Sequence, residues 1–135
     1  FSNRYGVAEG TKLSIPTIEF SYKDDLLHDP LINEYHAVAL NLATWREIEA
    51  IKKTAFKINE FLTDYLLKID IKLVDFKLEF GKFKNKIILA DEISPDTCRF
   101  WDKNTNEKLD KDRFRRDLGN VEEAYKEFAR RLMKK

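Results

Sequence analysis

The feature that most constrains the fold is a change of hydrophobic period near residue 70. Before it, apolar residues recur at spacings of three and four, which is the repeat of one face of an α-helix. After it, residues 71–80 alternate between apolar and polar, which is the period of a β-strand. The change of period therefore predicts a long helix followed by a strand. The residues of the helical stripe are Ile48, Ile51, Ala55, Ile58, Leu62, Tyr65 and Ile69.

The start of the long helix is marked by Thr44 and Glu47, three residues apart. A Thr or Ser followed three positions later by Glu forms a capping box, in which each side chain binds the other residue's backbone N–H. We therefore expect a helix from about 44 to 68, with its apolar stripe against the core. Binding of a partner along that stripe is the alternative.

The segments after the helix predict an antiparallel sheet with packed helices. Residues 71–80 form the first strand, 81–85 form a hairpin loop, and 86–91 return as a second strand. Residues 94–97, Ser-Pro-Asp-Thr, predict a turn, and 98–101 predict a short strand.

The two ends of the chain are less regular. Residues 11–22 are rich in β-branched and aromatic side chains, but Pro16 limits them to an edge or irregular strand. A short helix is expected near 33–41, and Asn120 followed by Glu123 predicts the start of a final helix. Residues 23–33 and 102–111 are polar and rich in turn formers, so we expect loops there.

The strand at 71–80 separates apolar from charged side chains. Alternate residues of a strand point to opposite faces, and neighbours on one face lie roughly 6–7 Å apart. One face is wholly apolar, and the other holds two carboxylates and an ammonium group in a row. The charged residues are Asp75, Lys77 and Glu79, and the apolar ones are Val74, Phe76, Leu78 and Phe80.

The returning strand adds Asp91 to this face. An ordinary hairpin would bring Asp91 close to Asp75 or Lys77, so that three carboxylates converge with a lysine. Mg²⁺ uses one or two carboxylates together with phosphate oxygens and water, and a lysine beside it suits an anionic substrate. A solvated sheet face of mixed charge is the alternative. Asp is unfavourable within strands, so the presence of Asp75 in this strand favours a functional role over a solvated face.

Composition limits the classes of partner. The 135 residues include 25 basic and 24 acidic side chains, for a net charge of +1, so we expect neither nucleic acid nor a membrane surface as partner. Cys98 is the single cysteine, which excludes an internal disulfide. We therefore expect a cytoplasmic protein, and no apolar run is long enough for a membrane span.

Several motifs resemble consecutive motifs of the SAICAR synthetase family, in that family's order and spacing, over essentially the whole chain. The resemblance implies an ATP- and Mg²⁺-dependent ligase of purine biosynthesis (phosphoribosylaminoimidazole-succinocarboxamide synthase). It also implies an α+β fold that is similar to ATP-grasp and kinase-like folds. The motifs are Asp-Asp-Leu-Leu-His-Asp-Pro at 24–30, Val-Asp-Phe-Lys-Leu-Glu-Phe-Gly at 74–81, Leu-Ala-Asp-Glu-Ile-Ser-Pro-Asp-Thr-Cys-Arg at 89–99, Trp-Asp-Lys at 101–103 and Leu-Asp-Lys-Asp-Arg-Phe-Arg at 109–115.

The family joins 5-aminoimidazole-4-carboxylate ribonucleotide to L-aspartate and converts ATP to ADP and phosphate. The resemblance implies an acyl phosphate on the imidazole carboxylate, which the aspartate amine then attacks. Phosphoryl transfer depends mainly on positioning and on neutralising charge, which metal ligands and cations supply.

The resemblance also assigns residues to roles. Glu79 and Asp91 resemble the ligands of the Mg²⁺ that holds the ATP phosphates, and Lys23 resembles a nucleotide contact. Asp29 resembles an active-site acid, and Lys77 resembles a catalytic contact to anionic substrate groups. The residues that resemble substrate contacts are Asp75, Lys77, Asp96, Arg99 and Arg115, of which Arg99 resembles a clamp on the ribonucleotide phosphate.

The family's glycine-rich ATP-binding portion is absent from the chain. Residues 1–135 therefore resemble the C-terminal substrate- and metal-binding domain, and the family implies a homo-oligomer. Two alternatives stay open: a fragment that binds ligands without catalysis, and a small-molecule kinase that uses the same carboxylates.

Overall fold

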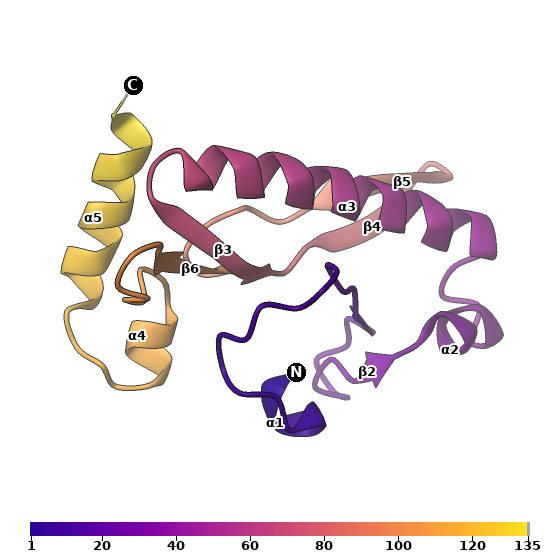
Figure 1. The fold of residues 1–135 in the computed structure, drawn as a ribbon. Coiled ribbons are helices and arrows are strands. Elements are labelled where there is room, and N and C mark those ends of the chain that lie inside the picture. Colours follow the sequence, from indigo (N-terminus) through magenta and orange to yellow (C-terminus); the bar gives the residue numbers. More distant parts are fainter. Residues whose placement is uncertain (135) are drawn as a thin grey trace. The chain divides into compact units, whose positions relative to one another are not determined.

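The computed structural model describes residues 1–134 as an α+β fold (Figure 1). The chain divides into two compact units, Phe1–Phe56 and Lys57–Lys135. Within the described residues, no helix is long and apolar enough to cross a membrane.

The first unit has short elements and little buried apolar surface. Only the end of the predicted extended segment 11–22 pairs as a strand, and Pro16 lies outside it. The antiparallel pair matches Phe20 with Ile32. The short helix expected near 33–41 is confirmed. The elements are α1 (Ser2–Tyr5), β1 (Phe20–Ser21), β2 (Leu31–Ile32), α2 (Glu34–Ala39) and the beginning of α3 (Trp45–Leu67).

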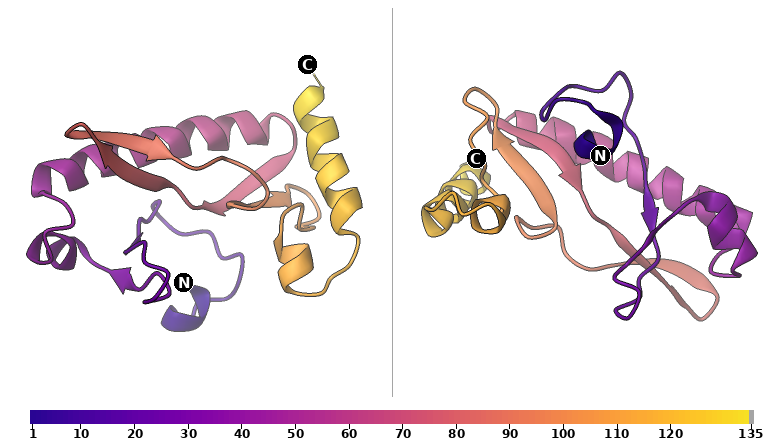
Figure 2. Two further views of the ribbon diagram at one scale, coloured as in Figure 1. Left: turned by 180° about the vertical axis from the view of Figure 1, so that it is seen from behind. Right: turned by 90° about the horizontal axis from the view of Figure 1, so that it is seen from below.

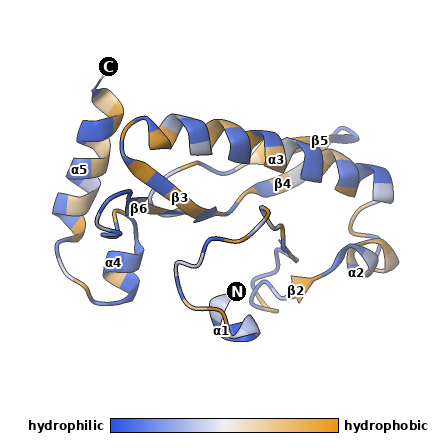
Figure 3. Cartoon of the chain, viewed as in Figure 1, coloured by the Kyte–Doolittle hydropathy of each residue, from blue (hydrophilic) through white to orange (hydrophobic). Residues whose placement is uncertain are grey.

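Helix α3 begins at the predicted capping box. The Glu47 N–H donates to Thr44 Oγ1 at 3.2 Å, and the Thr44 N–H donates to Glu47 Oε2 at 2.8 Å. The predicted bounds are therefore confirmed to within a residue. The predicted stripe is wrong near its end, because Leu66 is buried whereas Tyr65 is 41% exposed. Hydrophobic and hydrophilic residues alternate along the helix (Figure 3).

The second unit contains two antiparallel strand pairs (Figure 2). Strand β3 (Ile71–Phe76) pairs with β6 (Cys98–Asp102), and β4 (Glu79–Phe83) pairs with β5 (Lys86–Ala90). The single strand predicted at 71–80 is therefore wrong, because the chain changes partner between β3 and β4. The Lys77 N–H still donates to the Thr97 carbonyl at 2.8 Å, just before that change.

The loop of the β4–β5 hairpin is shorter than the predicted segment 81–85. Only Lys84 and Asn85 lie between the strands, and their φ angles are 46° and 61°. Two left-handed residues give a loop whose twist matches that of the strands it joins. Asn tolerates this conformation better than most residues, which helps to place the turn here.

A β-bulge interrupts β3 at Val74. Leu73 pairs with Phe100 and Asp75 pairs with Arg99, so Val74 is an extra residue without a partner on β6. Val74, which was predicted on the apolar face with Phe76, is 37% exposed. The extra residue moves the following side chains by one position, so Asp75 stays on the solvent side.

The hydrophobic core of the second unit lies between the β3–β6 pair and the helices. Phe100 of β6 stacks on Phe128 of α5 (Val121–Met133), with ring centroids 4.5 Å apart. Helix α5 begins after Asn120 as predicted, but Asn120 has φ 54° and its side chain makes no capping bond. A short helix, α4 (Asp112–Arg115), precedes it. The buried cluster comprises Leu66, Ile71, Cys98, Phe100, Leu109, Ala124 and Phe128.

Candidate active site

The first group of predicted site residues lies at the open end of the β4–β5 hairpin. Glu79 pairs with Ala90, so Asp91 follows directly after the last paired residue and lies across from the segment before Glu79. Asp91 has φ 70°, a left-handed conformation that ends the alternation of β5. Lys77 Nζ lies 2.8 Å from Glu79 Oε1. The open end of the hairpin thus holds Lys77, Glu79 and Asp91, and of these Lys77 and Glu79 are in contact.

Asp75 does not join this group through the hairpin. It belongs to the β3–β6 pair, where its Oδ2 lies 2.7 Å from Arg99 Nη1. We expected one hairpin of 71–80 and 86–91 that returns Asp91 close to Asp75 or Lys77. The Asp75 alternative is wrong, because Asp75 lies in the other strand pair. The structure instead joins Asp75 to Arg99, which was predicted as a separate substrate contact.

Asp112 links Arg99 to a second arginine. Its Oδ2 accepts a hydrogen bond from Arg99 Nε at 2.7 Å, and its Oδ1 accepts one from Arg115 Nη1 at 2.9 Å. The Asp112 side chain is only 7% exposed, whereas both arginine side chains are about two-fifths exposed. The structure therefore places two guanidinium groups side by side over a buried carboxylate.

Asp96 lies next to this arginine pair. Its backbone carbonyl accepts a hydrogen bond from Arg115 Nη2 at 3.1 Å, and its Oδ1 accepts one from the Tyr125 hydroxyl at 2.6 Å. The turn at 94–97 is confirmed, since the Thr97 N–H donates to the Ser94 carbonyl. One hydrogen-bonded network thus joins five residues, which we call the arginine cluster: Asp75, Asp96, Arg99, Asp112 and Arg115.

The charges of the arginine cluster stabilise one another. Burial by itself would raise the pKa of the Asp112 carboxyl, but hydrogen bonds from Arg115 and Arg99 outweigh it and lower that pKa below its usual value. Burial opposes the charge of Arg99 in the same way, and bonds to Asp112 and Asp75 leave its pKa raised. Asp112 and Arg99 are therefore both charged near neutral pH.

The predicted residues of the first unit lie in the loop between β1 and β2. Asp29 Oδ1 accepts a hydrogen bond from the Asp24 N–H at 2.9 Å, and Asp24 Oδ1 accepts bonds from Leu26 and Leu27. Both His28 and Asp29 have positive φ. The carboxylate of Asp29 thus closes a tight loop that begins directly after Lys23.

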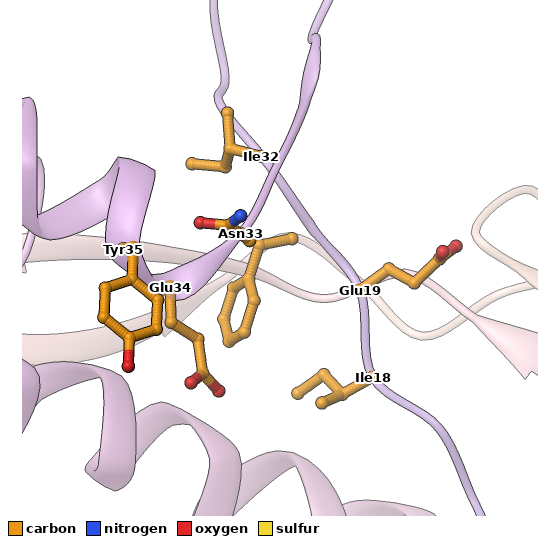
Figure 4. Close-up of a pocket in the computed structure, with 7 residues that line it drawn as sticks. Ile18, Glu19, Ile32, Asn33, Glu34 and Tyr35 are labelled. Atoms are coloured by element: carbon orange, nitrogen blue, oxygen red, sulfur yellow. The ribbon is translucent and has the colours of Figure 1, made fainter.

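A hollow of about 450 Å³ also lies in the first unit (Figure 4), but none of the predicted site residues lines it. Its polar side chains are used within the fold, since Glu19 pairs with Arg4, Glu34 pairs with Lys52, and Asn33 caps α2. The lining residues are Ile18, Glu19, Phe20, Ile32, Asn33, Glu34 and Tyr35.

The oxygen ligands that suit a hard cation come from the hairpin. No group of three or more His, Cys, Asp or Glu residues in 1–134 is arranged to hold a metal ion by itself. Two carboxylates at the open end of a hairpin fit Mg²⁺, because this ion commonly takes one or two carboxylates and completes its octahedron with phosphate oxygens and water.

Sequence reasoning missed Asp112 as a member of the arginine cluster and Tyr125 as the partner of Asp96. The spacing of Asp112 and Arg115, three apart on a helix, was the signal that could have paired them. No local pattern indicates the bonds from Asp112 to Arg99 or from Tyr125 to Asp96, because these join residues 13 and 29 positions apart.

Comparisons with known proteins agree with the resemblance in the sequence. The family model described as SAICAR synthetase matches residues 1–132. The phosphoribosylaminoimidazole-succinocarboxamide synthase of Caldanaerobacter subterraneus subsp. tengcongensis is 67% identical over 129 residues, which are 96% of this chain and 55% of that protein. That of Clostridium kluyveri is 62% identical over 131 residues, which are 97% of this chain and 56% of that protein.

Solved structures give the same result. The phosphoribosylaminoimidazole-succinocarboxamide synthase of Ehrlichia chaffeensis has a TM-score of 0.93 and 51% identity, and the match covers 98% of this chain and 57% of that one. A SAICAR synthetase in complex with ADP has a TM-score of 0.93 and 55% identity, with 99% and 57% covered. The chain thus spans little more than half the length of the relatives it matches.

Proposed function

Because the chain belongs to the SAICAR synthetase family, we propose that it supplies the substrate- and metal-binding part of an ATP-dependent ligase. The ligase joins 5-aminoimidazole-4-carboxylate ribonucleotide to L-aspartate and releases ADP and phosphate. The observation that carries the proposal is the arginine cluster, in which four of the five predicted substrate contacts form one hydrogen-bonded network.

The arginine cluster is suited to the phosphate of the ribonucleotide. Arginine keeps its charge at all relevant pH values and presents a planar set of donors that matches phosphate oxygens. Two such groups, held on a buried carboxylate and still exposed on their outer side, can bind a doubly charged anion. We assign Arg99 and Arg115 to that phosphate, with Asp75 and Asp96 lining the same pocket.

The open end of the hairpin is suited to the nucleotide phosphates. Glu79 and Asp91 would hold Mg²⁺, which when bound neutralises phosphate charge and orients the transferred group. Lys77 lies against Glu79 and bears the positive charge that faces the reacting groups. Lys23, in the first unit, is assigned to the nucleotide as well.

The bond changes follow from the chemistry of amide formation. The imidazole carboxylate oxygen attacks the γ-phosphorus of ATP, and ADP leaves. The amine of L-aspartate then attacks the carbonyl carbon, the new C–N bond forms, and the C–O bond to phosphate breaks. Lys77 neutralises the anionic groups during both steps. Asp29 is the acid assigned to receive the proton that the amine loses.

The same proposal places the chain in a larger protein. Residues 1–135 form its C-terminal part, and a nucleotide-binding portion with an ATP-grasp-like fold precedes them. The complete protein assembles as a homo-oligomer and acts in the cytoplasm.

The test uses the completed enzyme, by which we mean residues 1–135 joined to the part of the Caldanaerobacter relative that this chain does not span. It is assayed with ATP, Mg²⁺, L-aspartate and the aminoimidazole carboxylate ribonucleotide. Amide product is expected. Binding without turnover would instead support a ligand-binding fragment, and ATP consumption that does not depend on aspartate would support a kinase.

A further inference from the structure

We propose that Asp112 is a positioning residue, which fixes the spacing of Arg99 and Arg115 so that together they bind a phosphate monoester. The inference rests on the proposed function, because it takes that phosphate to be part of the substrate. It goes further by assigning a role to a residue that would not touch the substrate at all.

Asp112 binds both arginines at once. Each of its carboxylate oxygens binds a different arginine, Arg99 at 2.7 Å and Arg115 at 2.9 Å. The arginines come from separate elements, β6 and α4, so no local backbone geometry fixes the distance between their side chains. A buried carboxylate between them does, since charge-assisted hydrogen bonds have narrow ranges of length and direction.

Asp110 holds Asp112 in place. It is fully buried, its Oδ1 accepts the Asp112 N–H at 2.8 Å, and its Oδ2 accepts the Phe100 N–H at 2.8 Å. Phe100 is the neighbour of Arg99 in β6. One carboxylate therefore ties the backbone that carries Arg99 to the backbone that carries Asp112. The Lys111 N–H adds a bond to the Pro95 carbonyl.

The arginines keep donors for a ligand. A guanidinium group has five N–H bonds, and Asp112 takes one from each arginine. Asp75 takes a second from Arg99, and the Asp96 carbonyl takes a second from Arg115. Both side chains are about two-fifths exposed, whereas Asp112 is 7% exposed, so a ligand reaches the arginines and not the carboxylate. Asp75, whose side chain is 56% exposed, binds Arg99 Nη1, which shows that this exposed donor can hold an anionic oxygen.

The primary test is Asp112→Asn in the completed enzyme. The amide keeps the shape, but its NH₂ group faces an arginine donor, so at least one of the two bonds is lost. We expect the KM for the ribonucleotide to rise at least about tenfold, with kcat and the KM for ATP changed by less than about twofold. A purely structural role would lower the melting temperature and the active fraction without this selective change.

A substrate without the phosphate sharpens the test. With the corresponding riboside, the unsubstituted enzyme and Asp112→Asn should show the same kcat/KM, because the arginines have no phosphate to bind. Asp117→Asn, at an exposed position just after α4, is the matched control and should leave every constant unchanged.

Two results would overturn the inference. One is an unchanged or lower ribonucleotide KM in Asp112→Asn, and the other is an equal loss with the riboside. If Asp112→Asn does not fold by circular dichroism, Arg115→Lys replaces it, since that exposed substitution keeps the charge but loses the guanidinium geometry. An unchanged ribonucleotide KM in Arg115→Lys also overturns the inference. Absence of amide product from the unsubstituted enzyme would instead contradict the proposed function.

Discussion

The carboxylates that bind Arg131 stabilise the second unit only while they are ionised. Arg131 Nη2 lies 2.7 Å from Asp102 Oδ2, and Arg131 Nε lies 2.7 Å from Glu127 Oε1. Hydrogen bonds from Arg130 and Arg131 lower the pKa of Glu127 to about 2, from an ordinary 4.5. A hydrogen bond from the Thr105 N–H lowers the pKa of Asp102 as well. Burial opposes this shift, and a hydrogen bond from Arg131 adds to it.

These pKa values predict how stability depends on pH. Because both folded pKa values lie below the unfolded ones, the stabilisation is fully present above about pH 4.5 and is lost as the pH falls toward 2. Urea unfolding of Glu127→Gln should show about 1 kcal/mol less stability at pH 7 and a weaker dependence in this range, since the pair is partly exposed. Glu122→Gln, which removes an exposed pair with Lys126, is the control. Identical pH dependence in both variants would contradict the prediction.

The two carboxylates of the hairpin should be required for Mg²⁺-dependent turnover. Glu79→Gln or Asp91→Asn in the completed enzyme should reduce Mg²⁺-dependent turnover at least about a hundredfold, because an amide is a poor ligand for a hard cation. Circular dichroism and the melting temperature should stay close to those of the parent. Glu60→Gln, an exposed acid on α3, is the control. Near-normal rates in both hairpin variants would remove the metal assignment.

The positions of single residues could be predicted where a sequence motif or the strand period includes them. The strand period placed Lys77 beside Glu79, and these two side chains are in contact. The same period placed Asp75 in that row, but Asp75 belongs to the other strand pair and binds Arg99. Asp112 could not be found in this way, because its bond to Arg99 depends on how residues 103–111 fold back along β6. The Leu109 N–H, for example, donates to the Phe100 carbonyl.

Among the elements, α3 depends on its cap for part of its stability. Thr44→Ala removes the side-chain acceptor of the Glu47 N–H, which should cost about 1 kcal/mol. Thr54→Ala, at an exposed position inside the same helix, should be neutral or slightly stabilising, because Ala has the higher helix propensity. Urea unfolding followed by the helical signal at 222 nm measures both. A cost for Thr54→Ala equal to that of Thr44→Ala would contradict the role of the cap.

The elements were predicted well where local chemistry specifies them. The capping box gave the start of α3, and the Ser-Pro-Asp-Thr turn lies where its residues indicate. The break between β3 and β4 was not visible, because it depends on two different partner strands that lie later in the chain. Asn120 was predicted as a side-chain cap, but it adopts the left-handed conformation that Asn tolerates.

Across the whole chain, apolar burial is uneven between the two units. Among the described residues, the buried hydrophobic side chains of the first unit are Ala37 and Ile48. The second unit holds the buried cluster around Phe100 and Phe128. Hydrogen exchange should therefore be faster in β1 and β2 than in β3 and β6. Equal protection in the two strand pairs would contradict this expectation.

Removal of a core ring should affect only the unit that contains it. Phe128→Ala deletes a ring stacked on Phe100 and should destabilise the second unit by about 3–5 kcal/mol. Exchange in β3 and β6 should then accelerate, while exchange in β1 and β2 stays as before. Met133→Ala, at an 82% exposed side chain, is the control. Acceleration in both strand pairs would show that the units unfold together.

The bulge at Val74 determines which changes of chain length β3 tolerates. Val74 has no partner on β6, so a chain that lacks it would still pair Leu73 with Phe100 and Asp75 with Arg99. Loss of Leu73 would be equivalent, because Val74 could then pair with Phe100. Loss of Lys72, which is paired, would instead turn Ile71 or Leu73 away from the core. An alignment of family members should therefore accept a one-residue gap at Leu73 or Val74 but not at Lys72.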